Sequence, residues 1–473
     1  MIEIVVVILT NIIIFLSLSL IGTPLSVLVV YLPICYYLNN RYNTSLFHAA
    51  LIGFLGFFFS MLWLFSGLIT NYGIICYVLS VLYHSILSGS LVVVAYIVIN
   101  RKYNNKLFVI LLTSLFATFV ETFKEIGPIS FPASISLSEA GNAFFMDIAS
   151  IVGYYGVHYT VISINLLMTY ILLSSKEYFS KIMVILFVIM LVIICYDTNN
   201  RYIITSNKSI YVSIVQPSIP IENIRNDNVD GIATIQRLIS QSDAKLIVIP
   251  EGFAKLITLK SLNDFKSDCQ LRNINLLINI NDVDMQYRKI YNSVALIETN
   301  GNIWQYYHKK RTVPLAEDDY TPYNGYDSQI EFQHIGISVN ICFESLFQSI
   351  GNETINDNTK LYAVLADDAG MLGYTLPYLH LKYSQYRASE NGVYTIHASQ
   401  AGPSAFITPD GSIITASSIS SITNLSASIP IMRIRTWYNI FGKYVSSAII
   451  LWVILYLTCE FVHNTCVKSK YNK

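Results

Sequence analysis

Long runs of hydrophobic residues, separated by short polar stretches, fill the first 197 positions of the chain and return once near the C-terminus. Each run is close to the roughly 20 residues that an α-helix needs to cross the hydrocarbon core of a bilayer. The pattern therefore predicts a multi-pass α-helical membrane bundle of about eight spans. The predicted spans cover residues 4–20, 22–38, 47–66, 73–98, 107–121, 149–173, 181–196 and 445–462.

Residues 198–443 follow a different pattern, because short apolar segments there end at polar or glycine-containing turns. Such segments are typical of strands, whereas Gly231–Gln241 and Leu376–Gly392 have helical spacing. Asn300-Gly301 and Asp410-Gly411 each separate two predicted strands, which indicates hairpin turns. The mixture predicts one layered domain of the α/β or α+β class with its own core. The predicted strands cover residues 209–218, 245–251, 274–282, 291–298, 303–309, 334–342, 361–366, 394–399, 403–408 and 424–431.

Composition supports a division into three sections. The 473 residues are 53% hydrophobic and 13% charged, against roughly 25% charged in a typical soluble domain. The net charge is zero, which excludes a global basic field for nucleic acid. Residues 198–443 carry 20 of the Lys and Arg residues and 22 of the Asp and Glu residues. We therefore expect a transmembrane bundle at 1–197, one folded domain at 198–443, and a transmembrane helix with a short tail at 444–473.

Basic residues outside the middle section indicate the orientation in the membrane. With eight spans, nine of these ten Lys and Arg residues fall on one side, and only Lys124 falls on the other. Lys and Arg favour the cytoplasmic side of short loops. Both termini are therefore expected in the cytoplasm, and the α/β domain on the extracytoplasmic side. The first run lacks a small-residue cleavage site and is expected to be an uncleaved anchor.

Three reactive side chains lie at the ends of predicted strands. Glu251 ends the segment KLIVIPE, Lys309 ends the strand that begins at Ile303, and Cys342 ends HIGISVNIC. A cysteine beside the backbone N–H groups of a turn suits a nucleophile, and a carboxylate at the carboxyl edge of a sheet suits an α/β active site. Taken singly, each also fits an ordinary role, as a buried cysteine, a loop glutamate or a basic surface turn. Their common setting favours one shared site.

Other cysteines and histidines give weaker indications. Cys269 lies in a polar helix or loop and is interpreted as incidental. The five cysteines outside the α/β domain lie in or beside apolar spans, so neither a metal-ligand set nor a disulfide pattern appears. His84 and His158 lie within predicted spans, where an ionisable side chain is either functional or packed in its neutral form. We predict neither a metal nor a cofactor.

Several segments resemble a known family. LIVIPEG, YHKKRTVPLAE and ICFE, in this order, resemble the active-site segments of the nitrilase (carbon–nitrogen hydrolase) superfamily. With several spans before the domain and one after it, the chain resembles the apolipoprotein N-acyltransferase family of bacterial inner membranes over nearly its whole length. VQPSIP at 215–220, IVGYYGVHYTVISIN in the sixth span and the R-A-x-E-x-G pattern at 387–392 extend the resemblance. It implies an αββα sandwich for the α/β domain.

The resemblance implies roles for particular residues. Glu251, Lys309 and Cys342 align with the family's catalytic trio. Glu317 aligns with its second active-site glutamate, and Glu344 with a further active-site acid.

Phe343 stands where the family has Tyr, and a backbone N–H near it is expected to bind the oxyanion. Ile249 and Ala316 also depart from the family's usual Trp and Gly. These departures lie at the pocket and leave the identity of the acyl donor and acceptor open.

The implied reaction moves a fatty acyl chain from a membrane phospholipid, through a thioester on Cys342, to the N-terminal amine of a diacylglyceryl-cysteine lipoprotein. Glu251 is expected to act as the base, and Lys309 to stabilise the oxyanion. Glu317 is expected to orient Lys309, and Glu344 to position the acceptor amine.

Phospholipid, lipoprotein and membrane lipid are the expected partners of a monomer, with no nucleic acid. Two alternatives stay open. The first is a nitrilase-family amidase or an N-acyltransferase with another acceptor, and the second is a non-catalytic scaffold or transporter.

Overall fold

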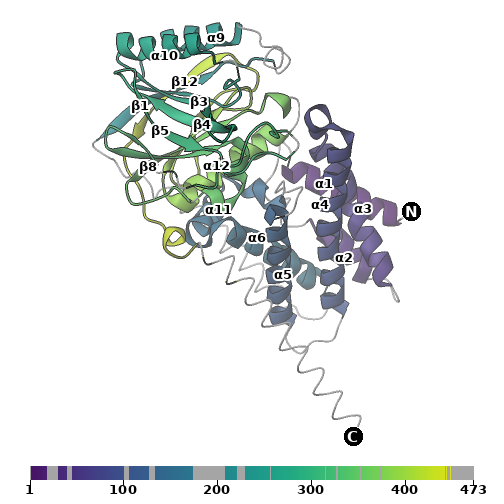
Figure 1. The fold of residues 1–473 in the computed structure, drawn as a ribbon. Helices are drawn as coiled ribbons and strands as arrows, with labels where there is room; N and C mark the ends of the chain where they lie inside the picture. The colour runs from purple at the N-terminus through teal and green to yellow at the C-terminus, as the bar shows by residue number, and fades with distance from the viewer. Residues whose placement is uncertain are drawn as a thin grey trace.

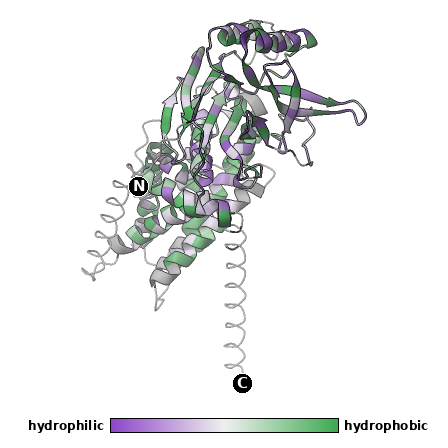
Figure 2. Ribbon diagram, turned by 90° about the vertical axis from the view of Figure 1, so that its left-hand side faces the viewer, coloured by the Kyte–Doolittle hydropathy of each residue, from purple (hydrophilic) through white to green (hydrophobic). Residues whose placement is uncertain are grey.

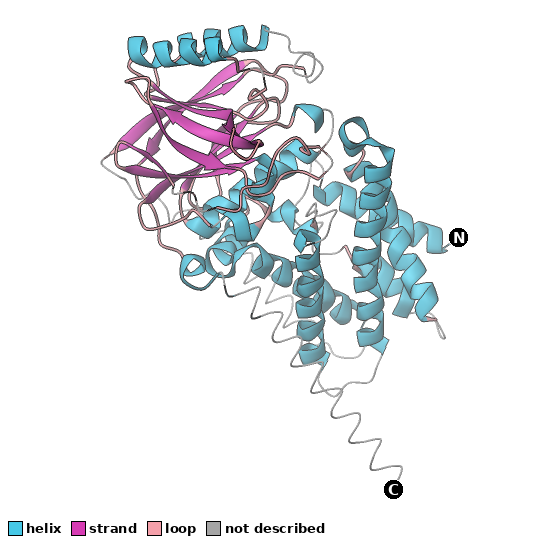
Figure 3. Cartoon of the chain, viewed as in Figure 1, coloured by secondary structure: helices cyan, strands magenta, loops and turns pink. Residues whose placement is uncertain are grey.

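The computed structural model describes residues 2–18, 30–39, 45–100, 106–126, 134–173, 208–220 and 230–442, apart from 256, 315, 326, 328, 352 and 372–374, together with 444 and 448. These residues form an α/β domain and a bundle of helices, which lies beneath the domain in Figure 1. Figure 3 shows that the strands are confined to the α/β domain.

Two six-stranded sheets form the centre of the α/β domain, in the orders β12-β1-β2-β3-β4-β5 and β11-β10-β9-β8-β7-β6. The central strands of each sheet are parallel and the outer strands pair antiparallel. The first sheet contains β1 (Ser209–Gln216), β2 (Leu246–Ile249), β3 (Asn275–Asp284), β4 (Lys289–Ile297), β5 (Ile303–His308) and β12 (Thr423–Pro430). The second contains β6 (Ile330–Phe332), β7 (Ile335–Ile341), β8 (Thr359–Ala366), β9 (Tyr394–Ser399), β10 (Ala405–Ile407) and β11 (Ile413–Ala416).

Alternation along the strands divides the hydrophobic residues between two cores. In β2, Leu246 and Val248 belong to the core between the sheets, whereas Ile247 and Ile249 belong to the core beneath α9 (Asp230–Ser240) and α10 (Leu259–Arg272). These two helices cover the outer face of the first sheet (Figure 1). On the second sheet, α12 (Leu376–Asn391) packs against β9 and β10. The layers are helix, sheet, sheet and helix, so the expected αββα sandwich is confirmed.

Each of the ten predicted strands has an observed counterpart whose ends differ by at most two residues. The two predicted helices correspond to α9 and α12, and Gly392 caps α12 in the left-handed conformation, with φ 61°. Two short strands, β6 and β11, and the helix α10 were not predicted. β6 has three residues and β11 has no buried side chain, while α10 is largely polar and begins at a Thr258–Ser261 capping box.

The other part of the chain contains six described α-helices. They are α1 (Ile2–Leu18), α2 (Leu32–Asn39), α3 (Leu46–Leu64), α4 (Leu68–Asn100), α5 (Lys106–Ile126) and α6 (Ala143–Leu173). Three helical segments are long and apolar enough to cross a membrane, and two further apolar helices are shorter. The long segments are Leu46–Leu64, Gly73–Val94 and Ala143–Tyr170, and the shorter ones Ile2–Leu18 and Ile110–Thr122. The predicted spans 181–196 and 445–462 lie outside the described residues, apart from Ala448, so the number of eight spans stays a prediction.

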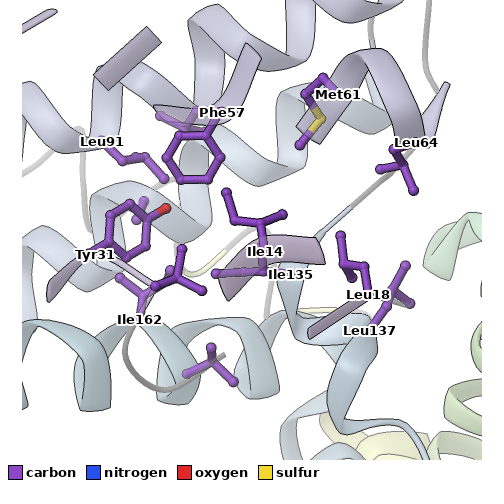
Figure 4. Packing of buried hydrophobic residues seen from close by; sticks show 14 of the residues in the cluster. Ile14, Leu18, Tyr31, Phe57, Met61, Leu64, Leu91, Ile135, Leu137 and Ile162 are labelled. Carbon is purple, nitrogen blue, oxygen red and sulfur yellow. The ribbon is translucent and has the colours of Figure 1, made fainter. Parts of the chain in front are cut away.

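The helices of the bundle pack around a hydrophobic cluster. Ile14 of α1, Phe57 and Met61 of α3, and Ile162 of α6 lie close together in it (Figure 4). Asn11 of α1 adds a polar link, because its Oδ1 accepts hydrogen bonds from the backbone N–H and the hydroxyl of Ser60. Many hydrophobic side chains of α1, α3 and α4 are exposed, and the helices beneath the α/β domain are coloured mostly hydrophobic in Figure 2. Such a surface suits contact with lipid.

The α/β domain is joined to the bundle at a break in α6. Gly153 interrupts the helix with φ 75° and ψ −177°, a conformation restricted to glycine. The backbone N–H of Tyr154, just after the break, donates to Glu390 Oε1 of α12 at 2.7 Å. The same oxygen accepts from Gln348 Nε2 at 2.7 Å, and Arg387 forms a fully buried ion pair with Glu390. A membrane helix and the helix beneath the second sheet therefore share one buried polar junction.

Candidate active site

Lys309 lies between two carboxylates at one edge of the sandwich. Its Nζ donates to Glu251 Oε1 and to Glu317 Oε1, each at 2.8 Å. Glu251 follows the end of β2, Lys309 follows the end of β5, and both are almost fully buried. Burial alone would lower the pKa of Lys309, but the two carboxylates outweigh it and raise that pKa well above its usual value. Lys309 is therefore a buried, permanently charged ammonium.

Asn292 completes this cluster and was not found from the sequence. It lies in β4, and its Nδ2 donates to Glu251 Oε1 at 2.7 Å and to Glu317 Oε1 at 3.0 Å. The backbone carbonyl oxygen of Asn292 also accepts a hydrogen bond from the backbone N–H of Lys309, at 2.8 Å. The only sequence signal was a polar side chain at the start of the buried part of a strand. Asn292 holds the two carboxylates on either side of the ammonium.

Cys342 is the residue that directly follows β7 and begins a short 3₁₀ helix, η4 (Cys342–Leu346). Its φ is +48°, in the left-handed region that costs a non-glycine residue roughly 1 kcal/mol. Burial raises the pKa of the thiol, and the Glu251 charge raises it further, while Lys309 opposes the shift. The trio therefore lies within electrostatic reach, and Cys342 holds a neutral thiol that requires a base before it can attack.

Glu344 is fully buried, and its carboxylate joins two turns of the site. Oε1 accepts from the backbone N–H groups of Lys310 and Arg311, at 2.6 and 3.3 Å. Oε2 accepts from the Ile341 N–H at 2.8 Å and from the Tyr307 hydroxyl at 3.0 Å. Burial raises the pKa of Glu344 to about 7. These bonds tie the turn after β5 to the turn that begins at Cys342.

The residues after Cys342 contact the membrane part of the chain. Phe343, Leu346 and Phe347 are buried members of the same hydrophobic cluster as the bundle helices. The ring of Phe343 lies against Phe347, with centroids 4.8 Å apart, and the Arg311 guanidinium lies 3.7 Å from the Phe347 ring centre. The turn that carries the thiol is therefore supported by side chains packed against apolar helices.

A second acid and base, Asp368 and His380, lie next to Cys342, and His380 was not found from the sequence. His380 of α12 contacts Asp368, with Nδ1 and Oδ1 2.9 Å apart, and its Nε2 lies 3.1 Å from the Cys342 carbonyl oxygen. The Cys342 sulfur, an Asp368 oxygen and a His380 nitrogen all lie within 4.8 Å of one another. This is the one set of three candidate metal ligands among the described residues. Both His380 nitrogens are already hydrogen-bonded, so the set is not arranged to hold a metal.

The remaining residues singled out from the sequence lie apart from this cluster. Cys269 is buried in α10, where burial raises the pKa of its thiol to about 12. His84 Nδ1 lies 2.8 Å from the Ser80 carbonyl oxygen within α4. His158 Nδ1 lies 2.9 Å from the hydroxyls of both Ser134 and Ser136. None of the three contacts Cys342.

Two family models match the chain. Residues 211–439 match the model of the carbon–nitrogen hydrolases, and residues 11–167 match the model of the apolipoprotein N-acyltransferase N-terminal domain. The apolipoprotein N-acyltransferase of Rickettsia prowazekii is 26% identical over 340 residues, which are 65% of this chain and 67% of that protein. The apolipoprotein N-acyltransferase of Geobacter metallireducens is 22% identical over 352 residues, which are 66% of each.

Among solved structures, Nit3 of Saccharomyces cerevisiae, of branch 10 of the nitrilase superfamily, is 18% identical. Its match covers 50% of this chain and 95% of Nit3, with a TM-score of 0.38. One family model thus matches the membrane part of the chain and the other matches the α/β domain. The chain belongs to the apolipoprotein N-acyltransferase family, enzymes of the carbon–nitrogen hydrolase superfamily.

Proposed function

We propose that this enzyme transfers a fatty acyl chain from a membrane phospholipid, through a thioester on Cys342, to the N-terminal amine of diacylglyceryl-cysteine on a lipoprotein. The observation that carries the proposal is the buried cluster of Lys309, Glu251 and Glu317 within electrostatic reach of Cys342. Packing of Phe343 and its neighbours against the apolar helices supports a substrate that stays in the bilayer.

In the first half of the reaction, the Glu251 carboxylate takes the proton of the Cys342 thiol. The sulfur then attacks the ester carbonyl carbon of the phospholipid, and the carbonyl oxygen becomes an oxyanion. The Lys309 ammonium and the Phe343 N–H stabilise that charge. When the intermediate collapses, the ester C–O bond breaks and the leaving oxygen takes the proton from Glu251. A lysophospholipid leaves and the acyl thioester remains.

In the second half, the lipoprotein amine attacks the thioester carbonyl, and Glu251 accepts its proton. Collapse forms the amide and breaks the C–S bond, and Glu251 returns its proton to the Cys342 sulfur. Glu317 and Asn292 hold the side chains of Lys309 and Glu251 in place through both halves of the reaction. The four hydrogen bonds of Glu344 favour a positioning role for this residue, in place of direct contact with the acceptor amine.

We further propose the arrangement in the membrane. Residues 1–197 and 444–473 would supply eight spans with both termini in the cytoplasm, and residues 198–443 would lie at the outer surface of a bacterial inner membrane. The apolar helices and the relatives named apolipoprotein N-acyltransferase support a membrane location in a bacterium. Reporter fusions test the orientation, because a cytoplasmic reporter active at the C-terminus supports it and an inactive one contradicts it.

The decisive experiment traps the thioester. Purified protein in vesicles is mixed with a phospholipid that carries a labelled palmitoyl chain, and label on the protein is tested for release by hydroxylamine. We expect releasable label on the native protein and on Cys269→Ser, and none on Cys342→Ala. Addition of a diacylglyceryl-cysteine peptide should move the label to the peptide as an amide. Hydrolysis of small amides without any labelled thioester or peptide would favour the amidase alternative.

A further inference from the structure

Behind Cys342 lies a buried acid–base pair that the proposed mechanism does not use. Asp368 is fully buried, and its second carboxylate oxygen accepts from the Ser399 hydroxyl at 2.9 Å. His380 is 5% exposed and lies between Asp368 and Cys342. Ser345 adds a third contact, because its hydroxyl donates to the Cys342 carbonyl oxygen at 2.9 Å and lies 2.9 Å from His380 Nε2.

The partners of His380 determine its protonation. Nε2 faces the Cys342 carbonyl oxygen, which can only accept, so Nε2 carries a hydrogen. Nδ1 faces the Asp368 carboxylate, and an ionised carboxylate also only accepts, so Nδ1 carries one too. Burial would lower the pKa of His380, but Asp368 outweighs it and raises that pKa. The hydrogen bonds thus describe an imidazolium paired with a carboxylate.

The bond from His380 fixes the peptide that links Cys342 to Phe343. A peptide group is planar and trans, so its C=O and its N–H point in opposite directions. Holding the Cys342 carbonyl oxygen on one side therefore aims the Phe343 N–H to the other. Cys342 also needs such support, because it sits in the left-handed region.

We infer that His380, held by Asp368, is a positioning residue that aims the Phe343 N–H at the oxyanion and places a positive charge beside the Cys342 sulfur. The inference rests on the proposed acyl transfer. The titratable groups that face His380 are Asp368, Cys342, Glu251 and, with ring centres 5.0 Å apart, His397 of β9. Burial and the neighbouring His380 lower the pKa of His397 to about 3, so His397 is neutral and serves as a control.

The test compares two substitutions of His380. In His380→Gln, the side-chain amide can still donate to the Cys342 carbonyl oxygen, but the charge is gone. In His380→Phe, both the hydrogen-bond donor and the positive charge are lost. The first readout is the rate of thioester formation at saturating labelled phospholipid, and the second is the pH profile of Cys342 alkylation by iodoacetamide without lipid. His397→Gln, which alters the neighbouring ring and its bond to Ser384, is the matched control.

We expect thioester formation to slow about 100-fold in His380→Phe, the lower end of the loss seen when one oxyanion donor is removed. His380→Gln keeps a donor to the Cys342 carbonyl oxygen, so we expect a smaller loss there, about tenfold. The alkylation profile should move to higher pH in both variants. Per folded molecule, His397→Gln should stay closer to the native protein in both readouts than either His380 variant does. Thioester formation at the native rate per folded molecule, with an unmoved alkylation profile, would overturn the inference.

Failure of the proposed function is distinguishable from failure of this inference. If the native protein forms no thioester but the alkylation profile still moves in the His380 variants, the acyl transfer is wrong and the influence of His380 on the thiol stands. If the native protein acylates, and the His380 variants do so equally fast with an unmoved alkylation profile, only the inference is wrong.

Discussion

The Lys309 ammonium lies 2.8 Å from the Glu251 carboxylate in a setting that almost excludes water. Removing one partner of such a buried pair leaves a charge without compensation, which typically costs about 3–5 kcal/mol. We therefore predict that Lys309→Met abolishes thioester formation and also lowers the midpoint of thermal unfolding. Both are measured on purified protein in detergent.

The matched control for this substitution is Lys255→Met. Lys255 forms an exposed ion pair with Asp319 at 3.0 Å, and such pairs contribute about 0–1 kcal/mol. A thermal midpoint of Lys309→Met no lower than that of Lys255→Met would contradict the buried pairing.

The Glu344 carboxylate accepts four hydrogen bonds, and its replacement tests whether it serves the turns or the acceptor. Glu344→Gln keeps one acceptor oxygen and places an amide group against backbone donors, which should cost about 1–3 kcal/mol. We expect a lower kcat with an unchanged KM for the peptide acceptor. A raised KM with unchanged thermal stability would show instead that Glu344 contacts the amine.

The break in α6 predicts a difference between two glycines. Gly153 and Gly73 both have positive φ within apolar helices, at 75° and 80°. A Cβ on Gly153 would lie 2.1 Å from Gln348 Nε2 and 2.5 Å from Tyr438 Cε2, whereas a Cβ on Gly73 would meet nothing within 4 Å. Gly153→Ala should therefore lower the thermal midpoint and the activity clearly more than Gly73→Ala, in which only the backbone strain of about 1–3 kcal/mol remains. Equal effects of the two substitutions would mean that the contacts around Gln348 rearrange without loss of stability.

Glu139, in the 3₁₀ helix η2 (Ile135–Glu139) before α6, predicts a pH dependence of stability. Burial raises its pKa from 4.5 to about 8, while Lys382 opposes the shift. The folded protein holds this proton up to about pH 8, whereas the unfolded chain releases it near pH 4.5. The stabilising contribution of Glu139 is therefore complete below that lower value and is lost as the pH rises through 8.

The variant Glu139→Gln removes this loss. We compare the thermal midpoint of the variant with that of the native protein at each pH. The variant's gain over the native protein should be larger at pH 9 than at pH 5. Asp319→Asn, which neutralises a carboxylate that is 77% exposed, is the control for a simple change of net charge. An identical pH trend in both variants would contradict a buried, protonated Glu139.

The strands were predictable because each is a short apolar run that ends at turn residues. The runs are continuous in β2, β7 and β9 because these strands are buried on both faces. Glu251, Lys309 and Cys342 could be picked out because each stands at such an end and within a segment that resembles a family. Glu251 and Lys309 meet because β2 and β5 point the same way in one sheet, so that both strands end at the same edge. Cys342 follows a strand of the other sheet, and only the folded structure brings it within reach of them.

Asn292 and His380 could not be found in this way. Asn292 lies in the middle of a strand and His380 in the middle of a helix, so neither stands at an element's end. Their roles depend on which side chains the folded sheets bring within 3 Å, and no local pattern encodes that proximity. Glu344 shows the reverse case, because its position was found but its hydrogen bonds favour a different role from the one expected.

The hydrophobic cluster that joins Phe343, Leu346 and Phe347 to the membrane helices has a consequence for dissection of the enzyme. A fragment that contains only the sandwich would expose these hydrophobic side chains, which belong to the turn that begins at Cys342. Such a fragment should aggregate, or close that surface by a rearrangement that displaces the thiol. In this chain the apolar helices therefore also support the turn that begins at Cys342.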